Sequence, residues 1–576
     1  MKKKLLPALI VTGLIILVVI IMGITALINK YTPTKKTEDL KEYFNISSDD
    51  EAALIVDNEL SDYKAKIIDK KIYVDYKFVH DSLNSRFYWD ANENVLLYTT
   101  ASDIISAADS NSYGVTKQTN DFGYPIVKAT SDSALIALDY VKQYSNITFK
   151  SYDDPARIVI TSKWDEIDSA TVSKSTQVRV KGGIKSPILK EVKKDDKITI
   201  LDSGDKWDKV ATEDGVIGYI KRKALSESKK TKLTNPDYEE ETFTHIKKDK
   251  DICLAWNQVT SQSANSKVPQ VISSTKGINV MSPTWFYLND NNGNLADIAS
   301  KDYVSYCHSQ GIEVWGLFSN FENTDVDAAY VLTHTSTRTT LINQIMSAAF
   351  NYELDGVNID FENITEAAYG DSYIEFIREL AIKCHNNGIS LSVDVTVPAS
   401  FNKFFNRSDM ANFADYIVIM GYDEHYKGSD AGSVSSIPWV TEGVESTLKE
   451  VPADQIILGM PFYTRIWELT PKEDDDAVTD TEDQSKYTVA SQVYSMDAAA
   501  AQLATNNATA ALDEESGQNY AEWSVSNKLY KVWLEDTTSL EKRLKLVDDN
   551  KLAGAAFWKL GFENSSVWDT VIKYLN

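Results

Sequence analysis

The chain has 576 residues, of which 43% are hydrophobic and 25% charged, and its 59 Lys and Arg are outnumbered by 84 Asp and Glu, for a formal net charge of −25. This length and composition exclude a single small domain and a largely disordered chain. The negative charge argues against nucleic acid as a partner, because binding nucleic acid requires cations that neutralise its phosphates.

An uncharged run from Leu5 to Ile28 follows three lysines at the N-terminus. A helix of this length spans about 36 Å, enough to cross the hydrocarbon core of a membrane. The run is longer than the apolar core of a cleaved signal peptide, and no A-x-A-like cleavage site follows it. We predict that residues 1–30 form an uncleaved signal anchor and that the remaining chain faces the cell wall. A cleaved signal peptide is the alternative.

Residues 45–165 contain a faint internal repeat. Each copy predicts a helix, a strand, a turn and a second strand, so we expect an α+β repeat domain. The stretch Lys71–Thr100 resembles the small stalk domain named after the amino terminus of copper amine oxidase. The resemblance covers the fold only, and a plain spacer is the favoured role. We expect no copper because no His or Cys cluster is present. With an offset of 62 residues, the matching pairs are Val79 with Val141, Asn84 with Asn146, Phe87 with Phe149 and Thr99 with Thr161.

Residues 170–226 consist of short β segments separated by turn signals. Their order resembles the bacterial Src-homology-3-like modules, which implies a small β-barrel. Because such modules often bind cell-wall peptides, Trp207 or Tyr219 is a candidate for lining a groove. Both are equally compatible with a place in the module's core. Residues 227–248 are polar and predict a linker.

Residues 249–576 contain eight short apolar runs, most of them separated by segments of helix length. Alternation of strands and helices eight times over predicts a closed (β/α)8 TIM barrel. The interval before the last run is too long for one helical crossover, so we expect an α+β insertion at about 467–535. An acidic run at 473–483 predicts a solvated loop, because EF-hand spacing is absent. The apolar runs begin near Ile252, Ile278, Ile312, Gly356, Ser390, Tyr416, Ile456 and Gly554.

The fourth run, residues 355–362, reads DGVNIDFE. Side chains alternate between the two faces of a strand, so its apolar residues face the surrounding helices. Asn358, Asp360 and Glu362 face the inside of the barrel, where unpaired polar groups are costly unless they serve a function. Glu362 comes last, at the carboxyl end of the strand, where barrels of this kind place their active sites.

This run resembles the D-G-x-x-x-D-x-E signature of family 18 glycoside hydrolases, the chitinase-like enzymes. The segments VIMGYDEH at 418–425, IILGMPFYTRIW at 456–467 and GAAFWKLG at 554–561 resemble the sixth, seventh and eighth strands of that family. Many family members also carry an insertion before strand eight. The resemblance covers about residues 249–576 and implies a glycosidase.

The resemblance also implies residue roles. Glu362 would be the general acid, Asp360 would hold the 2-acetamido group of the substrate and stabilise an oxazolinium ion, and Tyr422 would donate a hydrogen bond to the acetamido oxygen. The tethered acetamido group replaces an enzymic nucleophile and gives retention of configuration. Trp558 would form the floor of the sugar subsite. Further expected substrate contacts are Asp423, Tyr463, Arg465 and Asn358.

Many chitinases carry Asp at the position of Asn358, whereas bacterial cell-wall and spore-cortex members carry Asn. We therefore expect peptidoglycan as the substrate. The alternatives are a chitinase or chitooligosaccharidase, a non-catalytic lectin-like barrel, and a wall-binding scaffold. We expect no cofactor and no metal, because the three cysteines are far apart and odd in number and the six histidines are scattered. We expect a monomer that contacts the membrane through its N-terminal helix.

Overall fold

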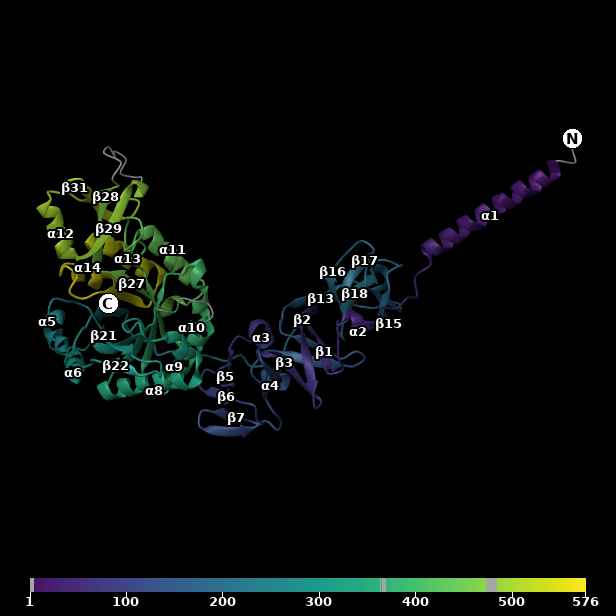
Figure 1. Ribbon diagram of the computed structural model, residues 1–576, viewed down its shortest axis with the longest axis horizontal. Coiled ribbons are helices and arrows are strands. Elements are labelled where there is room, and N and C mark those ends of the chain that lie inside the picture. The colour runs from purple at the N-terminus through teal and green to yellow at the C-terminus, as the bar shows by residue number, and fades with distance from the viewer. Residues whose placement is uncertain (1–4, 363, 365–368, 473–483, 576) are drawn as a thin grey trace. The chain divides into compact units, whose positions relative to one another are not determined.

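The computed structural model describes residues 5–362, 364, 369–472 and 484–575 (Figure 1). The chain forms two compact units. The first contains residues 1–87, 107–113 and 121–240, and the second contains residues 88–106, 114–120 and 241–576. The prediction of a multidomain chain with N-terminal β-sheet domains and a C-terminal parallel barrel is confirmed.

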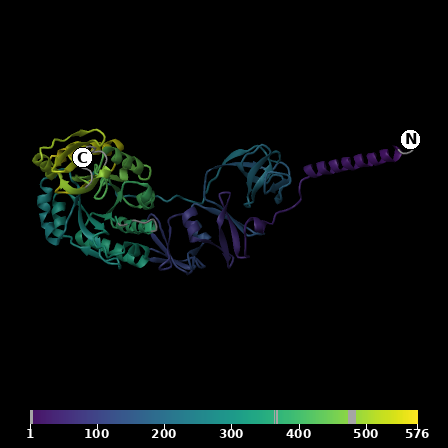
Figure 2. The same ribbon diagram turned by 45° about the horizontal axis from the view of Figure 1, so that its top comes forward.

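Helix α1, Leu5–Tyr31, is one uninterrupted helix (Figure 2). Its segment Pro7–Tyr31 has a mean hydropathy of 2.9 and is not buried by the rest of the protein. Its length and composition suit either a membrane span or a signal sequence. The chain is therefore secreted or associated with a membrane.

The first unit contains two seven-stranded sheets. In the first sheet the order is β11-β12-β1-β2-β3-β10-β9, and in the second it is β15-β14-β18-β17-β16-β13-β19. The strands of the first sheet are β1 Glu51–Val56, β2 Glu59–Ile68, β3 Lys71–Asp75, β9 Val127–Ala129, β10 Ala134–Ala137, β11 Thr148–Tyr152 and β12 Arg157–Thr161. Those of the second are β13 Glu166–Thr171, β14 Thr176–Arg179, β15 Ile188–Val192, β16 Lys197–Asp202, β17 Trp207–Thr212, β18 Ile217–Lys221 and β19 Lys229–Lys232. Short helices are α2 Leu40–Tyr43, α3 Tyr76–Phe78 and α4 Leu138–Gln143.

The two copies of the predicted repeat end up in different sheets. The second copy forms the hairpin β11–β12 of the first sheet, whereas the first copy forms β4 and β5 of a separate five-stranded sheet, β4-β5-β6-β7-β8. Most of β4 and all of β5 belong to the unit that contains the barrel. The strands of this sheet are β4 Phe87–Asp90, β5 Val95–Thr99, β6 Ile104–Ala107, β7 Ser112–Val115 and β8 Gln118–Asp121.

Polar contacts attach β4 and β5 to barrel helices α8, Thr335–Tyr352, and α9, Gly370–His385. The Tyr88 hydroxyl lies 2.8 Å from Oγ of Ser372, and Oγ1 of Thr99 donates to Oε1 of Glu375 at 2.8 Å. Asp90 accepts hydrogen bonds from the backbone N–H and the hydroxyl of Thr335 at the start of α8, both at 2.6 Å. This cap satisfies a free N–H group of the first turn, as N-cap residues do.

The second unit contains eight parallel strands in the closed order β20-β21-β23-β24-β25-β26-β27-β33, in which β33 pairs with both β27 and β20. The strands are β20 Ile252–Asn257, β21 Val280–Leu288, β23 Glu313–Ser319, β24 Gly356–Asp360, β25 Ser390–Thr396, β26 Tyr416–Met420, β27 Ile456–Pro461 and β33 Gly554–Trp558, with β22 Leu295–Asp297 added antiparallel to β21. The eight predicted runs thus correspond to the eight barrel strands.

Helices surround the barrel (Figure 1). Most of the apolar core lies between them and the strands, and a second cluster that includes Trp256, Trp315 and Tyr416 fills the barrel's interior. The remaining helices of this layer are α5 Val268–Ile272, α6 Lys301–Ser309, α7 Ala328–Thr333, α10 Arg407–Phe413, α11 Ile437–Thr447, α13 Thr537–Asn550 and α14 Val567–Tyr574.

An antiparallel sheet is inserted between β27 and β33, with the order β29-β28-β32-β31-β30. The segment that resembles a seventh strand is divided at Phe462, whose N–H donates to the carbonyl oxygen of Trp558 at 2.6 Å. The residues after Phe462 therefore belong to the inserted sheet. The acidic run at 473–483 lies outside the described residues. The elements are β28 Tyr463–Pro471, β29 Tyr487–Ser495, α12 Met496–Thr505, β30 Ala511–Asp513, β31 Gln518–Val525 and β32 Lys528–Leu534.

Candidate active site

Strand β24 presents three polar side chains that become more exposed toward its carboxyl end. Asn358 is 0% exposed and Asp360 7%, whereas Glu362, two residues beyond the strand, is exposed to solvent. The alternate residues Val357 and Ile359 are fully buried in the layer between strands and helices. The alternation predicted from the sequence is therefore present, and Glu362 is the outermost of the three.

The side chain of Asn358 uses its full hydrogen-bonding capacity. Its Oδ1 accepts from Nε1 of Trp256 at 3.0 Å and from Oγ of Ser282 at 2.9 Å. Its Nδ2 donates to Oγ of Ser392 at 3.0 Å and to Oδ1 of Asp394 at 2.7 Å. Two acceptor and two donor contacts are what a buried amide can make, so this network fixes the amide orientation.

Asp394 on β25 supplies a second buried carboxyl group beside this network and is 3% exposed. Burial, and then the charges of Asp394 and Glu362, raise the pKa of Asp360 well above its usual value. Burial also raises the pKa of Asp394. The two carboxyl groups thus disfavour each other's ionisation. The carboxyl group that neighbours Asp360 is thus that of Asp394 on the next strand, β25, whereas position 358 on the strand of Asp360 itself holds an asparagine amide.

Oδ1 of Asp360 is buried and has no hydrogen-bond partner among the described residues. Buried polar atoms are nearly always paired, so an unpaired carboxyl oxygen at the carboxyl end of a barrel strand indicates a place for a ligand donor. A substrate N–H is a group that could fill it.

The environment of Glu362 favours its protonated form. Burial of the part of the Glu362 side chain that is not open to solvent, and then the charges of Asp423 and Glu322, raise its pKa above the usual value for Glu. Nearby negative charges and reduced hydration both disfavour the carboxylate. A protonated outer carboxyl is what a general acid requires.

Aromatic rings lie beside these carboxyl groups. The ring centroid of Trp256, at the end of β20, is 6.5 Å from that of Tyr422 and 6.0 Å from that of Trp558, both edge-on. Tyr422 follows β26 by two residues, and Trp558 is the last residue of β33. Burial raises the pKa of Tyr422 well above 10, so its hydroxyl stays protonated and can donate a hydrogen bond.

The other three predicted substrate contacts, Asp423, Tyr463 and Arg465, lie together at the same end of the barrel. The Tyr463 hydroxyl donates to Oδ1 of Asp423 at 2.5 Å, and a guanidinium nitrogen of Arg465 lies 4.0 Å from the same oxygen. Arg465 also donates to Oγ of Ser491 at 3.3 Å. Tyr463 and Arg465 come from the inserted sheet, so the insertion contributes to the mouth of the barrel.

Several residues of this site were not predicted from the sequence. Asp394 and Ser392 occupy alternate positions of the fifth apolar run, which is the same signal that identified β24. Trp256 lies near the end of the first apolar run, and its side chain faces the inside of the barrel. Glu322 follows β23 by three residues and accepts a hydrogen bond from Oγ of Ser319 at 2.6 Å, and only its charge toward Glu362 identifies it. Among the described residues, no cluster of His, Cys, Asp and Glu is suited to a metal ion.

Comparison with known proteins supports the reading of the barrel. Residues 315–563 match Glycosyl hydrolases family 18. This match spans most of the barrel, from β23 to the residues that follow β33.

The chain is also similar to curated proteins of Bacillus. The chain is 24% identical over 302 residues to the uncharacterized glycosylase YvbX of Bacillus subtilis, covering 49% of this chain and 81% of the relative. It is 24% identical over 287 residues to the cortical fragment-lytic enzyme of the same organism, covering 48% and 63%. The crystal structure of the Bacillus cereus spore cortex-lytic enzyme SleL aligns with a TM-score of 0.50 at 18% identity, covering 57% and 74%, which indicates a shared fold.

A cleft of about 200 Å³ adjoins the outer carboxyl group, that of Glu362. Its lining includes Glu362, Asp394 and Met420, together with an aromatic wall. Within that wall Phe401 is 79% exposed. Open aromatic side chains next to buried polar groups are typical of sites that bind ligands with apolar faces and polar edges.

Proposed function

We propose that the chain is a membrane-anchored extracellular glycoside hydrolase that cleaves β-1,4 bonds at N-acetylglucosamine in peptidoglycan. One observation carries the proposal. Asp360 has a buried carboxyl oxygen without a hydrogen-bond partner among the described residues. It lies two residues before Glu362, on the same face of the strand, and the pKa of Glu362 is raised. Both residues lie at the carboxyl end of a strand in a barrel that matches family 18.

In the proposed mechanism, Glu362 gives its proton to the glycosidic oxygen as the bond to the anomeric carbon breaks. The acetamido oxygen of the same sugar forms a new bond to that carbon, and an oxazolinium ion results. Asp360 accepts a hydrogen bond from the acetamido N–H and stabilises the positive charge, while Tyr422 donates to the acetamido oxygen. The Glu362 carboxylate then takes a proton from water, which opens the oxazolinium ring with net retention.

We further propose that Trp558 forms the floor on which the sugar rests, because aromatic faces bind the apolar faces of sugars. The buried Trp256 packs edge-on against Trp558 from the barrel's interior. Asp423, Tyr463 and Arg465 are proposed to contact neighbouring sugars, supported by their hydrogen-bonded arrangement at the barrel's mouth. Asn358 holds the inner part of the site through its four contacts.

Asp394 is proposed to tune Asp360 as a positioning residue. In Asp394→Asn, the amide oxygen still accepts from Asn358, but the negative charge is lost. The pKa of Asp360 should fall, because a neighbouring negative charge disfavours its ionisation. We expect the acid limb of the pH profile of kcat/KM to move to lower pH, with the alkaline limb unchanged. An unmoved acid limb in a variant that unfolds at the wild-type temperature would contradict this role.

Peptidoglycan is preferred over chitin because a matched relative is named for its action on cortical fragments and because the proposed anchor directs the barrel to the cell wall. Chitinase or chitooligosaccharidase activity is the alternative. A lectin-like barrel is disfavoured, since Glu362 and Asp360 are both present.

The substrate is tested by mass spectrometry of peptidoglycan digested with the full chain. We expect N-acetylglucosamine at every new reducing end, because the acetamido group that attacks belongs to the sugar whose bond is cleaved. Muramic acid at the new ends would indicate a muramidase. Hydrolysis of chitin oligosaccharides with intact peptidoglycan would favour the chitinase alternative.

The proposed anchor is α1, retained in the mature protein. It is supported by the chain that follows α1, which pairs with the edge of the second sheet and so belongs to the fold. Residues 170–226 are proposed to form a Src-homology-3-like module and residues 45–165 a stalk-like α+β repeat domain.

A further inference from the structure

The segment that follows α1 is part of the second sheet. The backbone N–H of Thr34 donates to the carbonyl oxygen of Ile184, that of Glu38 to Ile188, and that of Ile188 to Lys36, each at 2.8 Å. Thr37 and Ile188 form a parallel bridge. Residues 32–38 therefore extend the sheet at its β15 edge, and no free tether separates α1 from the module.

Two cations fix the last turn of α1 and the segment after it to the same module. The buried guanidinium of Arg179 donates to the carbonyl oxygens of Ser186, at 2.7 Å, and of Thr34, at 3.3 Å. Nζ of Lys185 donates to the carbonyl oxygen of Thr32 at 2.8 Å and to that of Asn29 in the last turn of α1. A cation at the C-terminus of a helix binds the free carbonyl groups there and interacts favourably with the negative end of the helix dipole.

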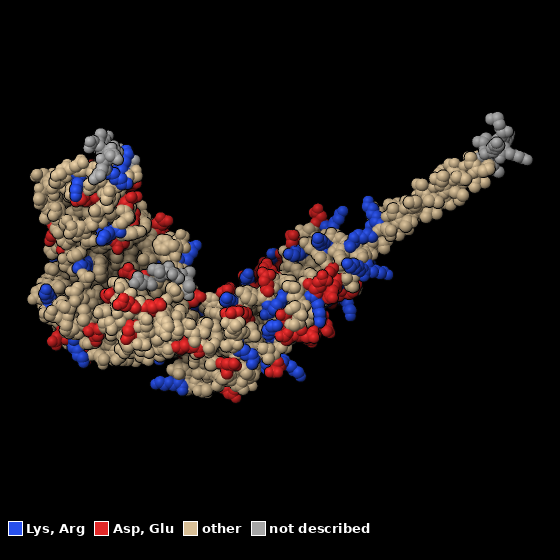
Figure 3. Space-filling model, viewed as in Figure 1, with Lys and Arg blue, Asp and Glu red and all other residues tan. Residues whose placement is uncertain are grey.

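The module carries positive charge in a chain that is otherwise acidic. Residues 170–226 contain 13 Lys and Arg and 8 Asp and Glu, whereas the whole chain has a net charge of −25. Figure 3 shows Lys and Arg side chains gathered where α1 meets the module. The excess of cations is therefore placed next to the predicted membrane span.

A cleft of about 430 Å³ lies on this module, and Ile184, which binds Thr34, is part of its lining. The cleft is thus beside the exit of the chain from α1. Trp207, Lys206 and Lys221 line it, and its other lining residues are Asp205, Arg222 and Lys223. Four of the seven side chains are basic and one is acidic, which suits a ligand with negative charge.

Trp207 is held in place as the aromatic wall of the cleft. It pairs across the strands β17 and β18 with Lys221, whose Nζ lies 5.7 Å from the centroid of the indole ring. The backbone of Gly182 lies against the ring, since a Cβ there would come within 3.1 Å of the Trp207 Cβ. Tryptophan beside Lys and Arg is the combination that membrane–water interfaces favour.

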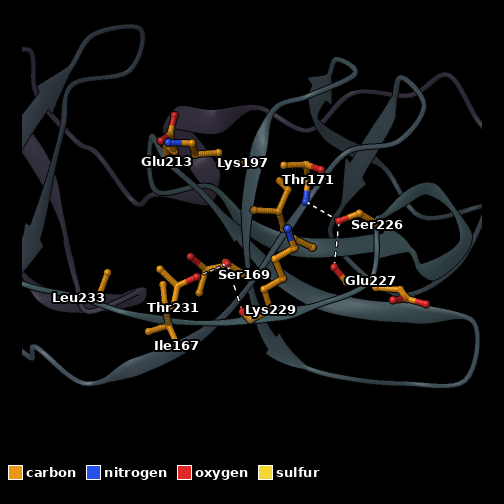
Figure 4. A pocket seen from close by; sticks show the side chains of 13 residues that line it. Ile167, Ser169, Thr171, Lys197, Glu213, Ser226, Glu227, Lys229, Thr231 and Leu233 are labelled. Carbon is orange, nitrogen blue, oxygen red and sulfur yellow. Dashed lines mark hydrogen bonds between the residues drawn. The ribbon is translucent and has the colours of Figure 1, made fainter.

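A larger pocket of the same module points to no ligand. It has a volume of about 690 Å³, and its charged lining residues are Lys197, Lys229, Glu213 and Glu227, two of each sign (Figure 4). Its hydroxyl groups bond to one another and to backbone, as Ser169 does with Thr231 at 2.7 Å.

We propose that the cleft formed by Ile184, Trp207, Lys206, Lys221, Arg222 and Lys223 binds the phosphate headgroups of anionic lipids in the leaflet from which α1 emerges. The module then sits on the membrane surface as a collar around the exit of α1. This inference rests on the anchor of the proposed function, because a cleaved α1 would release the module from the membrane.

The test uses the full chain in lipid nanodiscs and hydrogen exchange of the backbone amides of residues 204–224. In nanodiscs that contain phosphatidylglycerol, we expect exchange about tenfold slower than in phosphatidylcholine alone, as for a ligand present at about ten times its dissociation constant. The variant Lys206→Gln/Lys221→Gln/Lys223→Gln should lose this difference. The matched variant Lys174→Gln/Lys193→Gln/Lys194→Gln removes the same charge from exposed positions outside the cleft and should keep it.

Equal exchange in both lipids, or loss of protection in both triple variants, would overturn the proposal. Protection produced in phosphatidylcholine nanodiscs by inorganic phosphate, or by a soluble anionic wall polymer but not by phosphatidylglycerol, would assign the cleft to that ligand instead and also overturn it. The intact mass of the preparation shows whether α1 is present, so loss of the anchor is distinguished from failure of the lipid site. Glycan hydrolysis is measured separately and should be the same in both triple variants.

Discussion

Replacing Glu362 by Gln is expected to lower the turnover of peptidoglycan about 10²–10⁴-fold, the range that general acid catalysis contributes. The amide keeps the shape of the side chain but has no acidic proton to give to the leaving oxygen. Glycan binding should be nearly unchanged, because the proton transfer matters only in the transition state. Initial rates of reducing-end release and calorimetric titration with a non-hydrolysed fragment measure the two quantities.

The neighbouring carboxylate Glu322 offers a matched control. Glu322→Gln removes a negative charge that raises the pKa of Glu362, so the pKa of Glu362 should fall. The acid must be protonated to act, and the alkaline limb of the kcat/KM profile should therefore move to lower pH, with turnover at the optimum largely kept. Wild-type turnover in Glu362→Gln would refute the assigned acid.

Replacing Asp360 by Asn is expected to lower kcat about 10²–10³-fold, the usual effect of removing one preorganised charge or dipole at a developing charge. The negative charge of Asp360 would stabilise the positive charge of the oxazolinium ion. This ion exists only after the acetamido group has attacked the anomeric carbon. KM should change little. The measurement is steady-state kinetics on N-acetylated glycan strands.

Glycan strands without N-acetyl groups allow a double-change cycle, in which the wild-type protein and Asp360→Asn are each measured on N-acetylated and on de-N-acetylated strands. The wild-type protein should lose most of its activity on the de-N-acetylated strands, because they lack the internal nucleophile. Asp360→Asn should then cause no further loss, since both changes remove one interaction and their effects are not additive. A similar drop on both substrates would show that Asp360 acts through something other than the acetamido group.

Much of this site could be predicted because strand periodicity is local. The alternation in residues 355–362 states which side chains share a face, and chain order states that Glu362 is outermost, without reference to any other strand. The environment of Asn358 could not be predicted in the same way. Its partners Trp256, Ser282 and Asp394 are 102, 76 and 36 residues away and come from three different strands.

The repeat in the N-terminal region shows the same limit. Two similar stretches of sequence predict two similar hairpins, and both form, yet β4 and β5 belong to the barrel's unit and β11 and β12 to the other. The difference lies in side chains such as Tyr88 and Thr99, whose hydroxyls meet Ser372 and Glu375 of α9. A pattern within a short stretch of sequence does not predict contacts with residues that are far away in the chain.

The sequence by itself determined the apolar helix, the eight barrel strands, the presence of an insertion before the last of them and the polar line of β24, because each depends on composition or on a period along the chain. Only the tertiary structure decided which strand supplies the second carboxyl beside Asp360, that Tyr463 and Arg465 reach the site from the inserted sheet, and that residues 32–38 join the β15 edge. These features depend on which segments become neighbours when the barrel and sheets close, and hydrogen bonds between distant residues fix that choice.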